Sequence, residues 1–516
     1  MAKLTLNPYQ ISKVKQLAAE IAGDIQDAIE AYASVSVERT VLRLYGVDGA
    51  CEDKTPLPNK IVDLAQDREE LQKGISPFFA RAMLKTGRDA QTTAELLQRG
   101  HVNLSDTASI SQADVVGKEA ELAQQAIEIL ERTRFNKQKK QSTQTIPPQP
   151  WRYIIVATGD IYEDRTQARS AAFSGADIVA VIRSTAQSLL DYVPYGPTTE
   201  GFGGTFATQA NFRIMREALD EAGEEQGRYI RLVNYSSGLC MAEIAACAAL
   251  EDLDMLLNDS MYGVLFRDIN MKRTFIDQYF SRLICARAEI MINTGEDNYL
   301  TTSDAIEAAH TVTASQLINE ATAKKARLPD HLLGLGHAFE ISPQVENAFL
   351  YELAHAQLAR QLFPEAPLKY MPPTKYKSGD IFHAHCMDTM FNLASVITNQ
   401  GIHLAGILTE AIHTPLMQDR FQSLRNIDTI FNVAKDLGDE IEFKADGFIN
   451  KRAQQVLDET ERFLQDVKDT GLMSAIADGK FADISRSQDG GKGYDGVFQK
   501  AGDYSNPVMD LLEKQP

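Results

Sequence analysis

Apolar and polar positions follow a helical period over the first part of the chain. Val14, Leu17, Ile21, Ile25 and Ile29 recur at intervals of three and four residues, which predicts an amphipathic helix. We expect residues 1 to about 145 to be mainly helical.

A basic run and a proline-rich segment end this helical region. The run from Lys137 to Lys140 indicates a solvated helix end rather than a polyanion site. Residues 142–150 read Ser-Thr-Gln-Thr-Ile-Pro-Pro-Gln-Pro, a composition typical of a linker. The helical region is therefore predicted to end near residue 145, and the linker to run to Pro150.

After the linker, short apolar runs alternate with helical patterns. The apolar runs are Tyr153–Thr158, Asp177–Arg183, Tyr229–Tyr235, Leu253–Asn258, Glu289–Asn293, Leu332–Gly336, Leu368–Met371 and Ile402–Leu408. The clearest helical patterns between them are Phe212–Ala222, Thr274–Ala286 and Ser303–Ala323. Apolar strands joined by helices are typical of parallel strands buried on both faces. Eight such units predict an α/β fold, a (β/α)8 TIM barrel, with a doubly wound open sheet as the alternative.

These patterns predict three regions. Residues 1–150 form the N-terminal helical region and linker, and residues 151–436 form the barrel. Residues 437–516 add a helix over Lys451–Val467 and a glycine-rich stretch, Asp489–Gly496, which we expect to wrap the surface or meet a partner.

Composition and charge indicate which classes of binding partner are unsuitable for this protein. The 516 residues include 52 Lys and Arg and 71 Asp and Glu, so the formal charge is 52 − 71 = −19. This charge argues against nucleic acid and against an anionic membrane surface. No apolar run approaches the length of a membrane helix, and the first residues lack the apolar core of a signal peptide. Five scattered cysteines suit a reducing cytoplasm.

Several motifs with known chemistry are absent from the sequence. There is no Walker A sequence, no His-Glu-x-x-His, no Gly-x-Ser-x-Gly and no Cys-x-x-Cys. Asp-x-His-x-x-Gly, which places a histidine beneath cobalamin cobalt, is also absent, as is the cysteine triplet of an iron–sulfur cluster. A long chain without these motifs predicts a site assembled from strand ends.

Polar residues follow the predicted strands, where a barrel carries its active site. Arg183-Ser-Thr-Ala-Gln-Ser188 can hold a phosphate through Arg183 and the hydroxyl groups of Ser184, Thr185 and Ser188, or it can be a simple helix cap. The long loop from Tyr192 to Gly204 suits a lid, an interface or a flexible connection. The serines of Asn234-Tyr-Ser-Ser-Gly238 can bond a ligand ring or cap the next helix.

Later strand ends add an aromatic ring and charges. Tyr262 can stack on a flat cofactor or pack in the core, and Arg267 is a second anion contact or a surface residue. A turn does not require three adjacent polar side chains, so we expect a functional carboxylate in the run Glu296-Asp297-Asn298. A lysine inside an apolar strand is costly unless it is paired, so Lys369 is a site residue or reaches out to solvent.

The histidines carry a weaker signal. His383-Ala-His385-Cys386 opens a predicted helix, where residues two apart do not share a face, so we predict no metal site. His337, His403 and His413 are interpreted as structural.

Long runs of the sequence resemble the α-subunits of the lysine 5,6-aminomutase family. The runs are Arg183-Ser-Thr-Ala-Gln-Ser-Leu-Leu-Asp-Tyr-Val-Pro-Tyr-Gly196, Thr199-Glu-Gly-Phe-Gly-Gly204, Thr274-Phe-Ile-Asp-Gln-Tyr-Phe-Ser-Arg282, Asn293-Thr-Gly-Glu-Asp-Asn-Tyr-Leu-Thr-Thr302 and Lys369-Tyr-Met-Pro-Pro-Thr374. The resemblance implies an isomerase that uses pyridoxal 5′-phosphate (PLP) and adenosylcobalamin and moves the terminal amino group of D-lysine or L-β-lysine to the adjacent carbon. It implies a role in anaerobic lysine fermentation, in an α2β2 heterotetramer whose smaller β-subunit supplies the cobalamin domain and the lysine that bonds PLP.

The resemblance also implies roles for individual residues. Arg183, Ser184, Thr185, Ala186, Gln187 and Ser188 would form the phosphate loop of PLP. Ser237 would face the pyridine nitrogen, Tyr262 would stack on the ring, and Arg267 and Asn298 would complete the cofactor site. Asp297 and Lys369 would lie near the reactive edge and the substrate, so that Lys369 is a neighbouring donor.

Other classes of protein remain as alternatives. A different barrel enzyme, such as a metal-dependent lyase or aldolase, would act without PLP. A non-catalytic scaffold subunit would bind a partner and lack a PLP site. A relative that acts on ornithine is a nearer alternative, although it usually joins the barrel and cobalamin regions in one longer chain.

Overall fold

The computed structural model describes residues 3–102, 104, 110–182, 187–201, 203–236 and 238–514. Its central sheet consists of parallel strands in the spatial order β7-β6-β5-β4-β3-β2-β10-β9-β8. Their bounds are β2 (Trp151–Ile155), β3 (Ile178–Ile182), β4 (Arg231–Tyr235), β5 (Met255–Leu257), β6 (Met291–Asn293), β7 (Leu333–Gly334), β8 (Gly336–Ala338), β9 (Lys369–Met371) and β10 (Ile402–Leu404).

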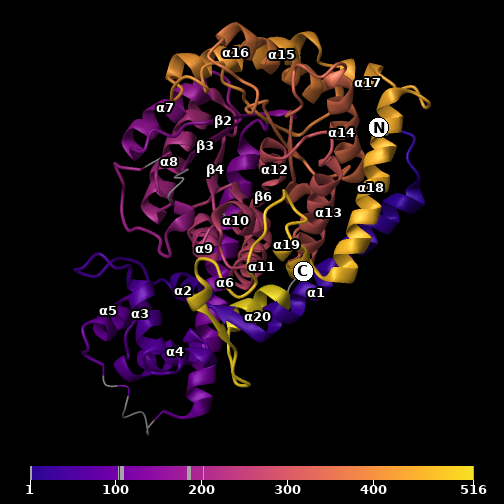
Figure 1. Ribbon diagram of the computed structural model, residues 1–516. Coiled ribbons are helices and arrows are strands. Elements are labelled where there is room, and N and C mark those ends of the chain that lie inside the picture. Colours follow the sequence, from indigo (N-terminus) through magenta and orange to yellow (C-terminus); the bar gives the residue numbers. More distant parts are fainter. Residues whose placement is uncertain are drawn as a thin grey trace.

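The sheet closes into a barrel of eight strands when β7 and β8 are counted as one. Strands β7 and β8 are separated only by Leu335, so they are two parts of one strand. β7 pairs with β6, β8 pairs with β9, and Leu335 itself accepts a hydrogen bond from the backbone N–H of Lys369 (2.8 Å). β10 pairs with both β9 and β2. The predicted (β/α)8 barrel is therefore confirmed, and the open sheet is ruled out (Figure 1).

Helices connect the strands and surround them. They are α7 (Ile161–Phe173), η2 (Gln187–Leu189), α8 (Gln209–Gln226), α9 (Met241–Leu250), α10 (Ser260–Arg267), α11 (Met271–Ala288), α12 (Glu296–Thr302), α13 (Ala309–Lys325), η3 (Asp330–Leu332), α14 (Ala348–Leu362), α15 (Ile381–Ile397) and α16 (Met417–Val433).

The predicted helix over Ser303–Ala323 starts too early. The chain is extended at Ser303, and the Asp304 carboxylate accepts hydrogen bonds from the backbone N–H groups of Ile306 (2.8 Å) and Glu307 (2.7 Å). This side-chain turn separates α12 from α13, because it offers the backbone an alternative to the helical hydrogen bonds.

Helices also precede the barrel. They are α1 (Pro8–Ala31), α2 (Val35–Leu44), α3 (Leu57–Gln66), η1 (Leu71–Lys73), α4 (Ile75–Thr86), α5 (Ala90–Gln98) and α6 (Gln112–Thr143), with the short strand β1 (Tyr32–Ser34) between α1 and α2. The apolar stripe that predicted the first helix is buried on α1. A capping box of Ser111 and Asp114 begins α6.

The prediction of a solvated helix end at Lys137–Lys140 holds for Lys139, which is exposed, but is wrong for Lys137. The Lys137 side chain is buried, and its Nζ donates to the carbonyl oxygens of Leu253 (3.1 Å), Ala288 (2.8 Å) and Glu289 (3.0 Å). Lys140 forms ion pairs with Asp220 (2.7 Å) and Asp252 (2.9 Å). The run therefore fastens the N-terminal region to the barrel.

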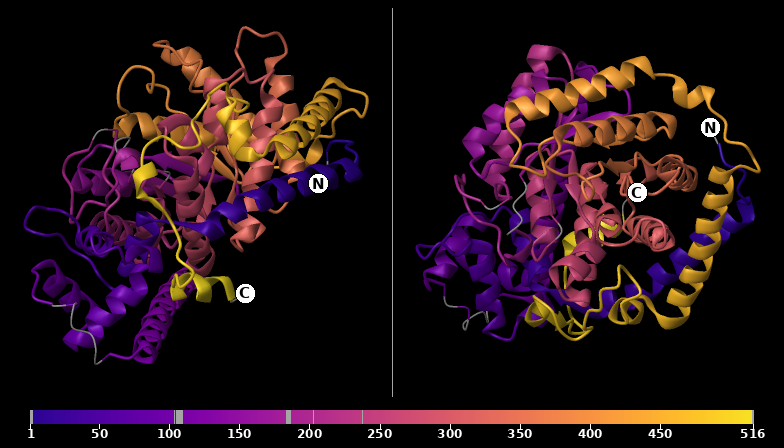
Figure 2. Two further views of the ribbon diagram at one scale, coloured as in Figure 1. Left: turned by 60° about the horizontal axis from the view of Figure 1, so that its bottom comes forward. Right: turned by 45° about the horizontal axis from the view of Figure 1, so that its top comes forward.

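The last part of the chain wraps the outside of the molecule (Figure 2). This is one of the two roles predicted for it, wrapping the surface or meeting a partner. Its elements are α17 (Leu437–Glu440), α18 (Phe448–Thr470), α19 (Leu472–Ala477), η4 (Tyr494–Gly496), β11 (Val497–Gln499) and α20 (Pro507–Lys514). Helix α18 packs against α1, α13 and α14. Strand β11 pairs antiparallel with β1, and α20 packs on α6, so the C-terminal tail packs on the N-terminal region.

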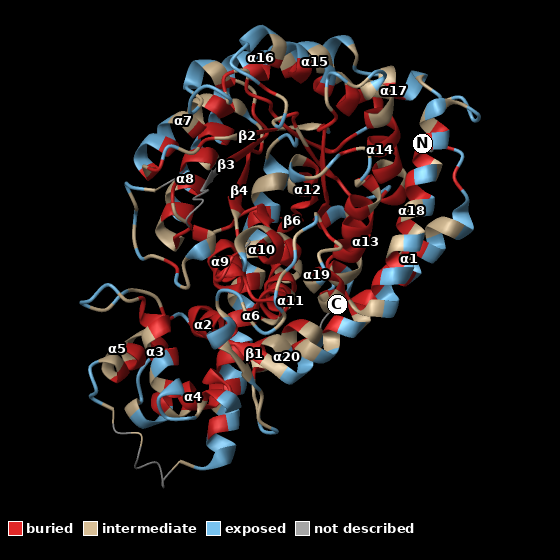
Figure 3. Ribbon diagram, in the orientation of Figure 1, coloured by how far each residue is buried: buried red, intermediate tan, exposed pale blue. Residues whose placement is uncertain are grey.

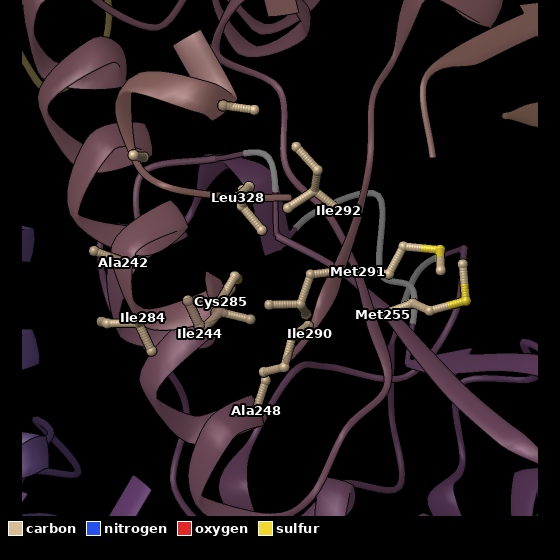
Figure 4. Packing of buried hydrophobic residues seen from close by; sticks show 14 of the residues in the cluster. Ala242, Ile244, Ala248, Met255, Ile284, Cys285, Ile290, Met291, Ile292 and Leu328 are labelled. Atoms are coloured by element: carbon tan, nitrogen blue, oxygen red, sulfur yellow. The ribbon is translucent and has the colours of Figure 1, made fainter. Parts of the chain in front are cut away.

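The core lies between the barrel strands and the inner faces of the surrounding helices. Figure 3 shows the strands and these faces buried and the outer faces exposed. Ala242, Ile244 and Ala248 from α9 meet Ile284 and Cys285 from α11 beside β5 and β6 (Figure 4). Burial on both strand faces explains why the strands read as continuous apolar runs. Over the described residues, no helix combines the length and apolar character needed to cross a membrane.

Candidate active site

A cavity of about 630 Å³ opens at the carboxyl ends of the barrel strands. This volume lies within the range that small-molecule sites usually have. The sequence-predicted residues that line it are Gln187, Ser188, Tyr262, Arg267, Asp297, Asn298 and Lys369. The other predicted cofactor residues, Arg183, Ser184, Thr185, Ala186 and Ser237, lie outside the described residues.

Lys369 and Asp297 form a buried ion pair in the wall of this cavity. The Lys369 Nζ lies 2.9 Å from Asp297 Oδ2, and the two residues are 3% and 1% exposed. Burial alone would lower the pKa of Lys369, but Asp297, together with Tyr235 and Glu296, outweighs it, so the pKa is raised. The lysine therefore stays protonated at neutral pH, and it does not reach out to solvent.

Helix α10 carries Tyr262 and Arg267 to the cavity. Arg267 Nη2 donates to the Tyr262 hydroxyl (2.8 Å), and the guanidinium lies 5.3 Å from the centre of that ring. The side chain of Asp259 begins α10 by accepting from the backbone N–H of Met261 (3.0 Å). The helix thus presents one aromatic ring and one cation side by side.

Helix α12 carries Asp297 and Asn298, and a carboxylate network lies behind it. Asn298 Nδ2 donates to Asp297 Oδ1 (3.2 Å). Glu296 is fully buried, and it accepts from Asn319 Nδ2 (2.8 Å) and the backbone N–H of Gly336 (3.1 Å). Burial and the neighbouring Asp259 raise the pKa of Glu296 to about 8.

Asp259 links the two helices that carry the predicted residues. Its Oδ2 accepts from the backbone N–H of Gly295 (2.9 Å), the residue before α12, while the same side chain begins α10. Asn319 donates to both Asp259 and Glu296. The sequence pattern does not mark Asp259 or Asn319 as site residues. The one signal for Asp259 is its place directly after a strand.

The segment after β10 contributes residues that sequence analysis did not single out. Glu410, Thr414 and Arg420 line the cavity. Glu410 Oε1 lies 2.9 Å from the Nζ of Lys377, which also pairs with Asp388 (2.6 Å). Glu410 follows a strand end, and that position was the one available signal.

The histidines divide into two groups. His337 contacts Glu352 (3.1 Å) and His403 contacts Asn392 (2.8 Å), both deep in the protein, as a structural role predicts. Burial lowers the pKa of His403 to about 3. His413, interpreted as structural, instead lines the cavity. Across the described residues, no three His, Cys, Asp or Glu side chains gather as metal ligands.

Fold and site together define a (β/α)8-barrel protein with a ligand cavity at the mouth, a buried lysine–carboxylate pair in its wall, and helical additions at both ends. The family model described as the D-lysine 5,6-aminomutase TIM-barrel domain of the alpha subunit matches residues 4–511. The chain therefore belongs to the family of lysine 5,6-aminomutase alpha subunits, whose activity is that of an isomerase.

Individual relatives agree with this family. The lysine 5,6-aminomutase alpha subunit of Acetoanaerobium sticklandii is 51% identical over 511 residues, which cover 99% of this chain and 98% of the relative. The protein of the same name from Fusobacterium nucleatum is 51% identical over 521 residues and 99% of each chain. The D-ornithine 4,5-aminomutase subunit beta of A. sticklandii is 27% identical over 378 residues, 70% of this chain and 51% of that protein.

Proposed function

We propose that this chain is the α-subunit of a lysine 5,6-aminomutase. It would convert D-lysine to 2,5-diaminohexanoate or L-β-lysine to 3,5-diaminohexanoate, in anaerobic lysine fermentation. The observation that carries the proposal is the 51% identity, over nearly the whole chain, to two proteins named for this activity. The match to the ornithine enzyme is weaker and covers about half of that protein.

The proposal includes a smaller β-subunit in an α2β2 heterotetramer. The α-subunit name of the relatives supports a partner chain. Because the sequence lacks Asp-x-His-x-x-Gly, we assign adenosylcobalamin mainly to that partner. We place the complex in the cytoplasm, which suits the five free cysteines.

The residues of the cavity fit PLP. Gln187 is buried at the cavity, and its Nε2 finds no hydrogen-bond partner among the described residues. The Nε of Arg267 is likewise buried and unpartnered in that part of the chain. Two hydrogen-bond donors that are unpaired among the described residues suit the anionic group of a cofactor, and the flat ring of Tyr262 suits its aromatic ring.

Each residue would have one task in holding PLP. Arg183, Ser184, Thr185, Ala186, Gln187 and Ser188 would hold the phosphate, Ser237 would face the pyridine nitrogen, Tyr262 would cover the ring, and Arg267 and Asn298 would complete the site. When bound, PLP carries the migrating amino group and adenosylcobalamin supplies the radical that starts the migration.

Lys369 and Asp297 would act at the reactive edge. The ion pair keeps a proton on Lys369 Nζ, so this lysine can donate to a cofactor oxygen while the Asp297 oxygens can accept from a substrate ammonium. Ile155, Met371 and Ile407 line the same cavity and would help to exclude water from a radical. A neutral serine hydroxyl at Ser237 would not force a proton onto the pyridine nitrogen, which suits radical chemistry better than transamination.

An activity measurement with three substrates tests the proposal. The chain is combined with a cobalamin-binding β-subunit, PLP and adenosylcobalamin without oxygen, and given D-lysine, L-β-lysine or D-ornithine. We expect diaminohexanoates from at least one lysine isomer and little turnover of D-ornithine. Preference for D-ornithine, or activity that needs no PLP and is lost with a chelator, would refute the proposal.

A further inference from the structure

The segment Gln187–Asp191 joins the cavity to the N-terminal helices. Gln187 and Ser188 line the cavity, while Asp191 does not. The intervening backbone is fastened at several points. Gln187 O accepts from Leu190 N (3.2 Å), Ser188 O from Leu239 N (3.4 Å), and Leu190 O from Cys240 Sγ (3.3 Å).

Asp191 is the point where three other elements meet this segment. Its Oδ1 accepts from Arg39 Nη1 and from Arg273 Nη2, each at 2.8 Å. Its backbone oxygen accepts from Arg39 Nη1 (2.9 Å) and from Asn59 Nδ2 (3.2 Å). Arg39 lies on α2, Asn59 on α3 and Arg273 on α11, so two of the three donors come from the N-terminal region.

The donors are themselves held in place. Arg273 is completely buried, and it also donates to Asp277 Oδ2 (2.9 Å) and to the carbonyl of Leu239 (2.8 Å). Arg39 is 6% exposed on α2, which packs against α9 (Figure 1). Burial would raise the pKa of Asp191, but Arg273 and Arg39 outweigh it and hold that pKa below its ordinary value. The carboxylate therefore stays charged at neutral pH.

The opposite side of the segment is also confined. A Cβ at Gly238 would lie 2.5 Å from Ser188 Cα, so the chain after β4 presses directly on the segment. With Gly238 on one side and Asp191 anchored on the other, the segment has little freedom to move.

We propose that Asp191 is a positioning residue for cofactor binding, and that Arg39 on the N-terminal helices acts through it on Gln187 and Ser188. The inference rests on the proposed function, in which these two residues hold the phosphate of PLP. Arg39 does not line the cavity, so it would act on affinity through its contacts with Asp191. The N-terminal helical region is then part of the cofactor site.

The physical basis is preorganisation. The apparent affinity is the intrinsic affinity multiplied by the fraction of molecules in which the binding segment has the competent arrangement. A smaller fraction therefore gives a weaker apparent affinity. Removing the charge at Asp191 loosens the segment without removing any group that lines the cavity. The loss of binding affinity should therefore come from the phosphate contacts, and the contacts to the ring should be unchanged.

Binding of PLP and of pyridoxal, which lacks the phosphate, separates these effects. Both are titrated into the complex of this chain with its β-subunit, by absorbance, for the wild type, Asp191→Asn, Arg39→Gln and the double variant. Asp428→Asn is the matched control, because it removes the exposed carboxylate of a different arginine–aspartate pair, 3.3 Å from Arg152. Thermal melting checks that each variant is folded.

We expect Asp191→Asn to raise the Kd of PLP about tenfold and that of pyridoxal less than about twofold. Arg39→Gln should give a smaller change of the same kind. The double variant should bind PLP no more tightly than Asp191→Asn, because Arg39 also donates to the backbone oxygen of residue 191. If both ligands weaken equally, or Arg39→Gln has no effect, the inference is overturned. If Asp191→Asn does not fold, Arg39→Gln alone decides the question. If wild-type protein binds PLP no better than pyridoxal, it is the proposed function of the segment that fails.

Discussion

Lys369 and Asp297 form an ion pair that is buried in the wall of the cavity. Breaking a buried pair leaves one charge uncompensated, which usually costs about 3–5 kcal/mol, whereas replacing both partners costs little. We predict that Lys369→Met lowers the free energy of unfolding by about this amount and that Lys369→Met with Asp297→Leu restores most of it. Urea unfolding measures both. If the double variant is as unstable as Lys369→Met, or even less stable, the interaction between Lys369 and Asp297 does not account for the loss of stability.

Glu296 should make stability depend on pH. Its carboxyl titrates near pH 4.5 when unfolded and near pH 8 when folded, so between these values the folded chain keeps a proton that the unfolded chain has lost. Stability therefore falls as pH rises through this window, by up to about 1.4 kcal/mol per pH unit. Glu296→Gln should flatten the slope measured by urea unfolding from pH 5 to 8. The exposed Asp428→Asn serves as control, and an unchanged slope in Glu296→Gln would contradict the assignment.

Among the elements, the packing of α12 on β8 positions Asp297. A Cβ at Gly336 would lie 2.7 Å from Thr294 O and 3.0 Å from Asp297 Oδ1. We predict that Gly336→Ala displaces the start of α12, costs about 1–3 kcal/mol and lowers activity at least tenfold. Gly379→Ala is the matched control, because a Cβ there meets nothing within 4 Å. Full activity of Gly336→Ala would show that this contact does not set the position of Asp297.

The elements also show what the sequence can predict. Strands buried on both faces leave an apolar run, so all eight were located, and Lys369 stood out because it interrupts such a run. The burial of Lys137 was not predicted, since the carbonyls it contacts belong to residues more than a hundred positions away. Asp259 and Asn319 were missed for the same reason, because each looks like an ordinary cap or helix residue until the fold joins them.

At the scale of the whole molecule, the C-terminal tail closes over the N-terminal helices. Tyr504 donates to the buried Glu38 (2.8 Å), and Gly493 O accepts from Arg273 (3.3 Å). We predict that a chain ending at residue 486 melts at a lower temperature and binds PLP more weakly, because Arg273 also holds Asp191. Calorimetry and PLP titration measure the two effects. A truncated chain with an unchanged melting temperature would show that the tail is dispensable.

The most direct test of the account is where PLP becomes covalently attached. The chain is incubated with PLP, alone and with a β-subunit, reduced with borohydride, and the labelled lysine is found by mass spectrometry. We predict a label on the partner only, which added lysine prevents, because Lys369 is held protonated by Asp297 in the α-subunit. A label on Lys369 would contradict it, since this chain would then carry the complete PLP site by itself.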